Sequence, residues 1–201
     1  MRAAFRLVVA LSGVSVSAIA QADQDPLQPY FLTEKDVPGL QALGEGRHAS
    51  GEDLTLIYDG GYQRYRDAGV MGASQRFYRL LDGTVEITLN EMSGPPAADG
   101  LLSAVCRDIK AMPTEVRRVR KARMCQVSRD GSAYGYVASG NLLAMVSLDR
   151  GDGKSVIRLL ESVARRWATL SSIPYGRHPG ATRRKLAADS RMENSPQMGA
   201  R

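Results

Sequence analysis

Residues 124–148, MCQVSRDGSAYGYVASGNLLAMVSL, decide the fold that we predict for this chain. They contain three short β-prone runs, which lie at 124–129, 132–138 and 142–148. Asp130-Gly131 separates the first two runs, and Ser139-Gly140-Asn141 separates the second from the third. Such residues are typical of tight hairpin turns, because glycine and asparagine tolerate positive φ angles. The stretch therefore predicts a three-stranded antiparallel meander.

A further hairpin is predicted upstream. Apolar and polar side chains alternate in residues 75–80 and 85–90, on either side of the turn Leu81-Asp82-Gly83-Thr84. This alternation is expected of a strand, because successive side chains point to opposite faces of a sheet. Residues 54–58 are a shorter candidate strand. Residues 62–68 suit one or two helical turns, because Gly69 is a common helix stop.

Two longer helices are predicted in residues 97–112 and 156–170, where apolar side chains recur at helical spacing. Pro113 and Pro174 end them, because proline lacks a backbone N–H. The expected order is β-β-α-β-β-β-α. It indicates an α+β fold, with an antiparallel sheet of about five strands and both helices packed on one face. The two apolar stripes are Ala98, Leu101, Leu102, Val105, Ile109 and Met112, and Val156, Leu159, Leu160, Val163, Trp167 and Leu170.

Residues 1–22 predict a cleaved signal peptide. Arg2 and Arg6 precede an apolar run at 7–20, and Ala20-Gln21-Ala22 matches the small-x-small pattern of a cleavage site. The apolar run is shorter than the roughly 20 residues that span a membrane. We therefore expect a periplasmic or secreted protein that does not span a membrane after cleavage.

The rest of the chain divides into three predicted parts. Residues 23–52 are expected to form an extended leader, because proline and glycine disfavour long regular elements. Residues 53–174 are expected to form a single α+β domain. Residues 175–201 have few apolar side chains and predict a disordered basic tail. The tail cations Arg183, Arg184 and Lys185 could touch an anionic surface, although a solubilising end is the simpler interpretation.

The positive charge is concentrated at the two ends of the chain. The formal net charge is +6 at pH 7, and loss of Arg2 and Arg6 with the signal peptide leaves +4. The tail carries six Lys and Arg against two Asp and Glu, so residues 23–174 have no net charge. Bulk charge therefore gives no reason to expect a nucleic-acid partner.

A local cationic cluster is the best candidate for binding an unknown envelope protein or an anionic ligand. Five clustered cations can hold an anionic ligand, a lipid headgroup or an acidic partner surface. A solvated connector, or an edge strand protected by charge, is the alternative. No aromatic residues are interleaved, which argues against single-stranded nucleic acid. The cluster consists of Arg117, Arg118, Arg120, Lys121 and Arg123.

Cys106 and Cys125 are the only cysteines. Both are expected to point into the layer between helix and sheet, and an oxidising compartment permits a disulfide between them. Two buried reduced thiols are the alternative. A catalytic redox pair is not expected, because the Cys-x-x-Cys spacing is absent.

Few other residues of the sequence suggest a binding, catalytic or metal site. Tyr58, Tyr62 and Tyr65 surround a glycine turn and could line a sugar or peptide site, or be half-buried rings. His48 lies near Ser50, Glu52 and Asp53 in sequence, and His178 falls in the tail. We expect no metal and no cofactor, because a metal site needs several convergent ligands. The serine-nucleophile elbow, the phosphate-binding loop and the His-Glu-x-x-His motif are absent.

Three functions remain open from the sequence. The leading hypothesis is an exported, non-catalytic protein that binds a partner protein or an anionic envelope ligand. The second is a hydrolase-like enzyme that uses scattered carboxylates or His48. The third is an accessory subunit of an envelope complex. A cationic groove would favour the binding protein. A pocket that brings together His48 or two carboxylates would favour the enzyme, and a flat apolar patch would favour the accessory subunit.

Overall fold

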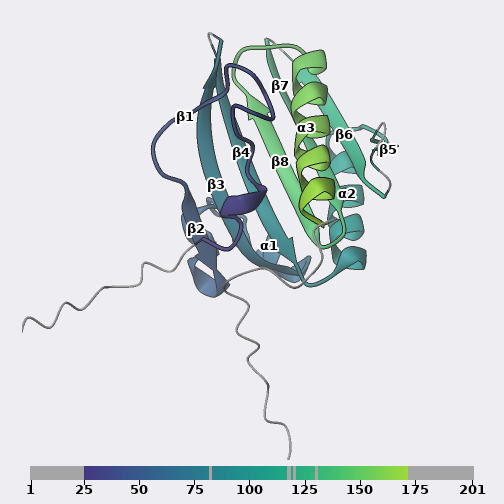
Figure 1. Cartoon of the computed structure of the whole chain (residues 1–201). Helices are drawn as coiled ribbons and strands as arrows, with labels where there is room; N and C mark the ends of the chain where they lie inside the picture. Colours follow the sequence, from purple (N-terminus) through teal and green to yellow (C-terminus); the bar gives the residue numbers. More distant parts are fainter. Residues whose placement is uncertain (1–24, 82, 117–118, 120, 130, 172–201) are drawn as a thin grey trace, which may run out of the picture.

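The computed structural model describes residues 25–171, apart from positions 82, 117–118, 120 and 130. The predicted signal peptide and basic tail lie outside these described residues, as do Arg117, Arg118 and Arg120 of the predicted cationic cluster. The described chain is a mixed α+β structure built on one antiparallel sheet (Figure 1).

Eight strands form the sheet in the order β1-β3-β4-β8-β7-β6-β5, and β2 also pairs with β3. Every pairing is antiparallel. The strands are β1 (Gln41–Ala42), β2 (Arg47–Ser50), β3 (Val70–Leu80), β4 (Gly83–Met92), β5 (Thr114–Glu115), β6 (Arg123–Arg129), β7 (Ser132–Ser139) and β8 (Leu142–Leu148).

The sheet confirms the predicted meander, which is β6, β7 and β8, and the predicted hairpin, which is β3 and β4. The prediction of about five strands is wrong, because the leader adds β1 and β2, and β5 precedes β6. Residues 54–58 were expected as a strand. Instead, Gly51–Leu56 is a 3-10 helix, whose first turn holds Glu52 and Asp53, and acids favour the start of a helix.

Three α-helices accompany the sheet in the described residues: α1 (Tyr62–Asp67), α2 (Pro95–Asp108) and α3 (Gly153–Ser171). The prediction that both long helices share one face is wrong. α3 packs on the face that carries Ile87 and Val146, whereas α2 packs on the face that carries Leu143. Figure 1 shows α3 in front of the sheet and α2 behind it.

Burial on both faces explains this arrangement. Leu142 and Leu143 are consecutive residues of β8, so their side chains point to opposite faces, and both are buried. Apolar side chains on both faces of the central strands need a cover on each side. Helical periodicity shows which side of a helix is buried but not which face of the sheet it meets.

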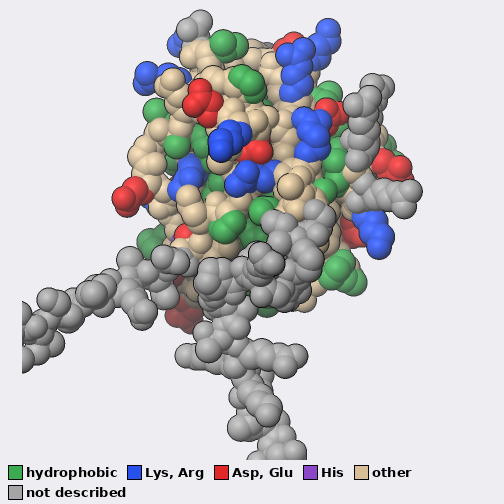
Figure 2. All heavy atoms as spheres, in the orientation of Figure 1, with side chains coloured by type: hydrophobic (Ala, Val, Ile, Leu, Met, Phe, Trp, Pro, Cys, Tyr) green, Lys and Arg blue, Asp and Glu red, His purple; other side chains and the backbone are tan. Residues whose placement is uncertain are grey.

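The outer surface of α3 is polar. Figure 2 shows this side of the molecule, where Lys and Arg side chains lie among Asp and Glu side chains. Arg165 lies 3.6 Å from Glu161, and Arg166 lies 3.0 Å from Asp36 of the leader. These arginines are therefore already paired with acids of the same chain.

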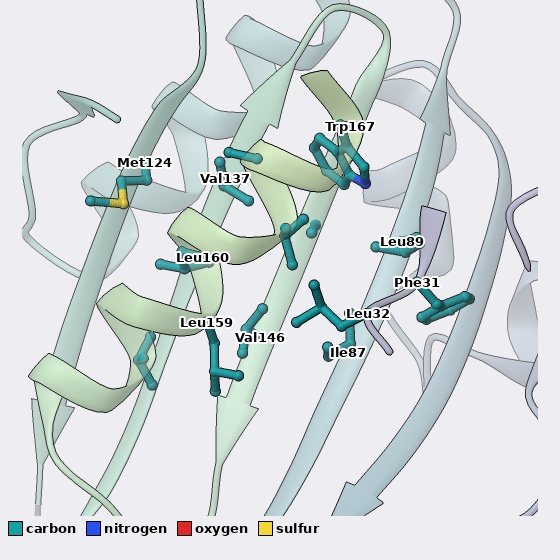
Figure 3. Close-up of a cluster of buried hydrophobic side chains, with 14 of the residues drawn as sticks. Phe31, Leu32, Ile87, Leu89, Met124, Val137, Val146, Leu159, Leu160 and Trp167 are labelled. Atoms are coloured by element: carbon teal, nitrogen blue, oxygen red, sulfur yellow. The ribbon is translucent and has the colours of Figure 1, made fainter. Parts of the chain in front are cut away.

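The leader docks on the α3 side of the sheet. Phe31 and Leu32 are 1% and 2% exposed and belong to the same core cluster as Leu89 of β4 and Trp167 of α3 (Figure 3). The Trp167 Nε1–H donates a hydrogen bond of 3.2 Å to the backbone carbonyl of Tyr30. The leader is thus part of the α3-side core.

Candidate functional site

A surface hollow lies where α2 ends and β6 begins, and its volume is about 570 Å³. Three of its lining residues are Arg or Lys and none is acidic, so we name it the cationic hollow. Guanidinium and ammonium groups are the side chains that bind phosphate and carboxylate oxygens most strongly. The lining residues are Ser103, Arg107, Lys110, Ala111, Met112, Pro113 and Arg123.

Lys110 has an unusual backbone in this hollow, with a φ of 57°. Its N–H donates to the carbonyl of Arg107 at 2.9 Å, and the N–H of Ala111 donates to the carbonyl of Cys106 at 2.8 Å. These two bonds make a Schellman motif, which ends α2 and usually has glycine at the left-handed position. A lysine there costs stability on the order of 1 kcal/mol relative to glycine. A strained lysine at a position where glycine is more stable points to a role for its ammonium group.

The cations of the hollow are only partly neutralised. Arg123 Nη1 lies 4.0 Å from Asp99 Oδ1, and Asp108 pairs with Arg64 on α1 instead. Within the described part of the chain, the structure gives Arg107 and Lys110 no ion pair. The C-terminal end of α2 carries roughly half a negative charge. Three cations exceed that charge, so the hollow can attract an anion.

A disulfide joins the two walls of the cationic hollow. Cys106 and Cys125 are bonded, as predicted, and their Cα atoms lie 5.9 Å apart. Cys106 directly precedes Arg107 in α2. Cys125 lies two residues after Arg123 in β6, and the side chains of alternate strand residues share a face. The bond therefore fixes the position of Arg107 relative to Arg123.

The structure places the predicted cluster only in part at this hollow. Arg123 lines it, whereas Lys121 is exposed in a turn with a φ of 64° and is not a lining residue. The sequence prediction missed Arg107 and Lys110. It continued the helix to Met112, because that residue extends the apolar stripe, whereas α2 ends at Asp108 and Met112 is 82% exposed.

His48 meets a serine and an aspartate that are distant in sequence. His48 Nδ1 lies 2.9 Å from Ser74 Oγ and 3.3 Å from Asp25 Oδ1, and the Ser74 hydroxyl donates to Asp25 Oδ1 at 2.6 Å. In a hydrolytic triad the acid binds the ring nitrogen that the serine does not. Here one nitrogen faces both groups, and Ser74 is 0% exposed. The trio ties Asp25, near the start of the leader, to β2 and β3.

Two of the three tyrosines around the glycine turn pack against each other. The rings of Tyr58 and Tyr65 are stacked, with centroids 3.9 Å apart, and Tyr58 is 6% exposed. Its hydroxyl donates to Asn90 Oδ1, and burial raises its pKa above the ordinary value. This geometry matches the interpretation of half-buried rings better than that of a ligand site.

α2 covers only part of its face of the sheet. A row of directly paired side chains crosses five strands there, and none of them is buried. Phe77, at one end of this row, is 37% exposed. We name it the open sheet row: Phe77, Glu86, Ser147, Tyr134 and Val127. A parallel row that includes Leu143 is buried beneath the helix.

The described residues offer neither a cluster of metal ligands nor a helix that could cross a membrane. They contain no group of three or more His, Cys, Asp or Glu side chains placed to hold a metal ion. Their helices include none that is both long and apolar enough to cross a bilayer.

Comparisons with known proteins give weak likenesses. No protein-family model matches the sequence, and no curated protein matches it. The extracellular domain of PknH from Mycobacterium tuberculosis is 8% identical, with a TM-score of 0.48 over 70% of this chain and 94% of that one. An uncharacterized protein from Mycobacterium smegmatis is 11% identical, with a TM-score of 0.34 over 69% of this chain and 91% of that one. Both TM-scores lie below 0.5, so these likenesses carry no function over to this chain.

Proposed function

We propose that this chain is an exported, non-catalytic protein that binds an anionic group of an envelope ligand or partner in the cationic hollow. One observation carries the proposal: Arg107, Lys110 and Arg123 converge on one hollow without an acidic lining residue. The left-handed lysine adds to it, because a cation stands where glycine would be more stable.

Export is part of the proposal, with removal of residues 1–22 and a periplasmic or secreted location. The signal-like N-terminal sequence supports it, and so does the disulfide, since disulfides persist mainly in oxidising compartments. The absence of catalysis is also part of the proposal. The burial of Ser74 supports it, because a nucleophilic serine must be reachable by its substrate.

Binding of inorganic phosphate tests the hollow. We expect backbone amide signals of residues 107–113 to shift when phosphate is titrated at low salt. Lys110→Gly should weaken binding about fivefold, which corresponds to about 1 kcal/mol for a charged hydrogen bond. The same substitution should raise the free energy of unfolding by about 1 kcal/mol, because glycine adopts the left-handed conformation without strain.

The opposite signs of these two effects separate lost binding from lost structure. Arg158→Gln is the matched control, because Arg158 is exposed on α3, on the other face of the sheet. It should leave the phosphate titration unchanged. Shifts spread over many surface cations, or equal affinities for Lys110→Gly and the unsubstituted chain, would contradict the proposal.

The open sheet row favours the accessory subunit as a second candidate function. Its side chains are apolar or aromatic at Phe77, which is exposed, and at Tyr134 and Val127, which are partly buried. A partly exposed apolar row of this kind suits a protein-binding surface. A photoreactive amino acid at position 77 should then cross-link to another envelope protein in living cells, whereas the same group at position 158 should not. Equal labelling at both positions would exclude this candidate.

A further inference from the structure

We infer that the anionic ligand of the cationic hollow is the phosphate headgroup of an anionic phospholipid at a membrane surface. This inference rests on the proposed function and names its ligand. It starts from an apolar feature beside the three cations. Met112 lines the hollow and is 82% exposed, and Pro113 and Ala111 line the same hollow.

An exposed methionine beside cations distinguishes a membrane surface from a soluble anion. A free phosphate is bound by charge and hydrogen bonds alone, and a neighbouring apolar side chain gains nothing. At a bilayer, cations meet the lipid phosphates while apolar side chains enter the boundary between headgroups and acyl chains. Residues 110–113 supply both parts within four consecutive positions, Lys110-Ala111-Met112-Pro113.

The surrounding charges allow this contact. Asp99 partly neutralises Arg123 at 4.0 Å, Asp108 is held by Arg64, and Glu115 of β5 is exposed nearby in sequence. Within the described residues, the structure gives Arg107 and Lys110 no acidic ion-pair partner that would compete with an incoming phosphate. The open shape of the hollow also suits a headgroup that stays attached to a bilayer, because a surface hollow does not have to enclose its ligand.

The backbone fixes how the two kinds of side chain are presented. The Schellman motif reverses the chain direction directly after α2, so residues 111–113 leave the helix axis instead of continuing along it. The disulfide holds the end of α2 against β6. Arg107, Lys110 and Met112 are therefore presented by a braced segment beside Arg123 of β6, and this segment loses little conformational freedom on binding.

Vesicle co-sedimentation tests the inference. The probes are vesicles of phosphatidylcholine alone and of phosphatidylcholine mixed with phosphatidylglycerol, at low and moderate salt. We expect binding to the anionic vesicles only, weakened by salt. Lys110→Gln should reduce it about fivefold. Met112→Ser should also reduce binding to vesicles, yet leave the titration with inorganic phosphate unchanged.

Two matched variants control for charge and apolar exposure elsewhere. Arg158→Gln removes an exposed cation from α3, and Met71→Ser removes a methionine that is 49% exposed in β3. Both should bind vesicles like the unsubstituted chain. All variants share the same terminal segments, so a contribution of the basic tail cancels in the comparison.

The outcomes separate this inference from the proposed function. Phosphate binding at residues 107–113 without a preference for anionic vesicles would overturn the assignment of a lipid headgroup as the ligand. It would still support the proposed anion site. Vesicle binding unaffected by Met112→Ser or Lys110→Gln would also overturn the headgroup assignment. Failure of the phosphate titration itself would overturn the proposed function and this inference together.

Discussion

Tyr78 of β3 carries a polar group into the α3-side core. It is 2% exposed, and its hydroxyl donates a bond of 3.3 Å to the carbonyl of Leu32. Burial raises its pKa to about 12, although Arg76 acts in the opposite direction. Tyr136 of β7 has its pKa raised to about 12 as well, again chiefly by burial.

These shifts predict a loss of stability at alkaline pH. An unfolded tyrosine loses its proton near pH 10, whereas Tyr78 in the folded chain keeps it up to about pH 12. The folded state therefore binds more protons in this window, and the free energy of unfolding should fall as the pH rises from 10 to 12. Urea unfolding at a series of pH values measures the slope. Tyr78→Phe should make it shallower, and an unchanged slope would contradict the assignment.

At this scale the sequence predicted few of the contacts that matter. Arg123 was identified because five cations stand close together in sequence. Lys110 was missed because its importance lies in a left-handed φ and in two backbone hydrogen bonds, which composition does not reveal. The meeting of Asp25, His48 and Ser74 was also missed. The pairing of β2 with β3 brings His48 beside Ser74, 26 positions away, and the leader brings Asp25 to Ser74, 49 positions away.

Among the elements, α2 and β6 are held together covalently. Replacing Cys106 and Cys125 together by alanine should lower the free energy of unfolding by about 3 kcal/mol, because their separation of 19 residues sets the chain entropy that the bond removes. Denaturant unfolding of the oxidised chain and of the double variant measures the difference. Two titratable thiols in the denatured, unreduced protein would contradict it, since no bond would then exist.

The elements themselves were the most predictable level. Hairpins such as β3–β4 and β6–β7–β8 are local, and their turns contain the Gly, Asp and Asn residues that such turns require. The side of the sheet taken by each helix was not predictable, because it depends on which strands become central. On one side β4 pairs with its hairpin partner β3. On the other side it pairs with β8, which is not the next strand in the sequence.

On the scale of the whole molecule, the leader and the body share one core. Phe31→Ala should lower the free energy of unfolding by about 3–5 kcal/mol, the usual cost of truncating a buried phenylalanine. Leu56→Ala is the control and should change it by less than about 0.5 kcal/mol, since Leu56 is 66% exposed.

The chain's only tryptophan reports on this shared core. Trp167 contacts the leader through Tyr30, so its fluorescence and the far-UV circular dichroism should change at the same denaturant concentration. A fluorescence transition that clearly precedes the loss of secondary structure would mean that the leader detaches on its own.

Because β4 pairs with β8, the centre of the sheet cannot be completed until late in synthesis. The paired residues run from Val85 with Leu148 to Glu91 with Leu142, so roughly fifty or more residues must follow β4 before its second neighbour exists. Until then the nascent hairpin has a bare edge that can associate with other chains. Synthesis through Leu148 therefore removes this hazard, because β8 then covers the exposed edge of β4.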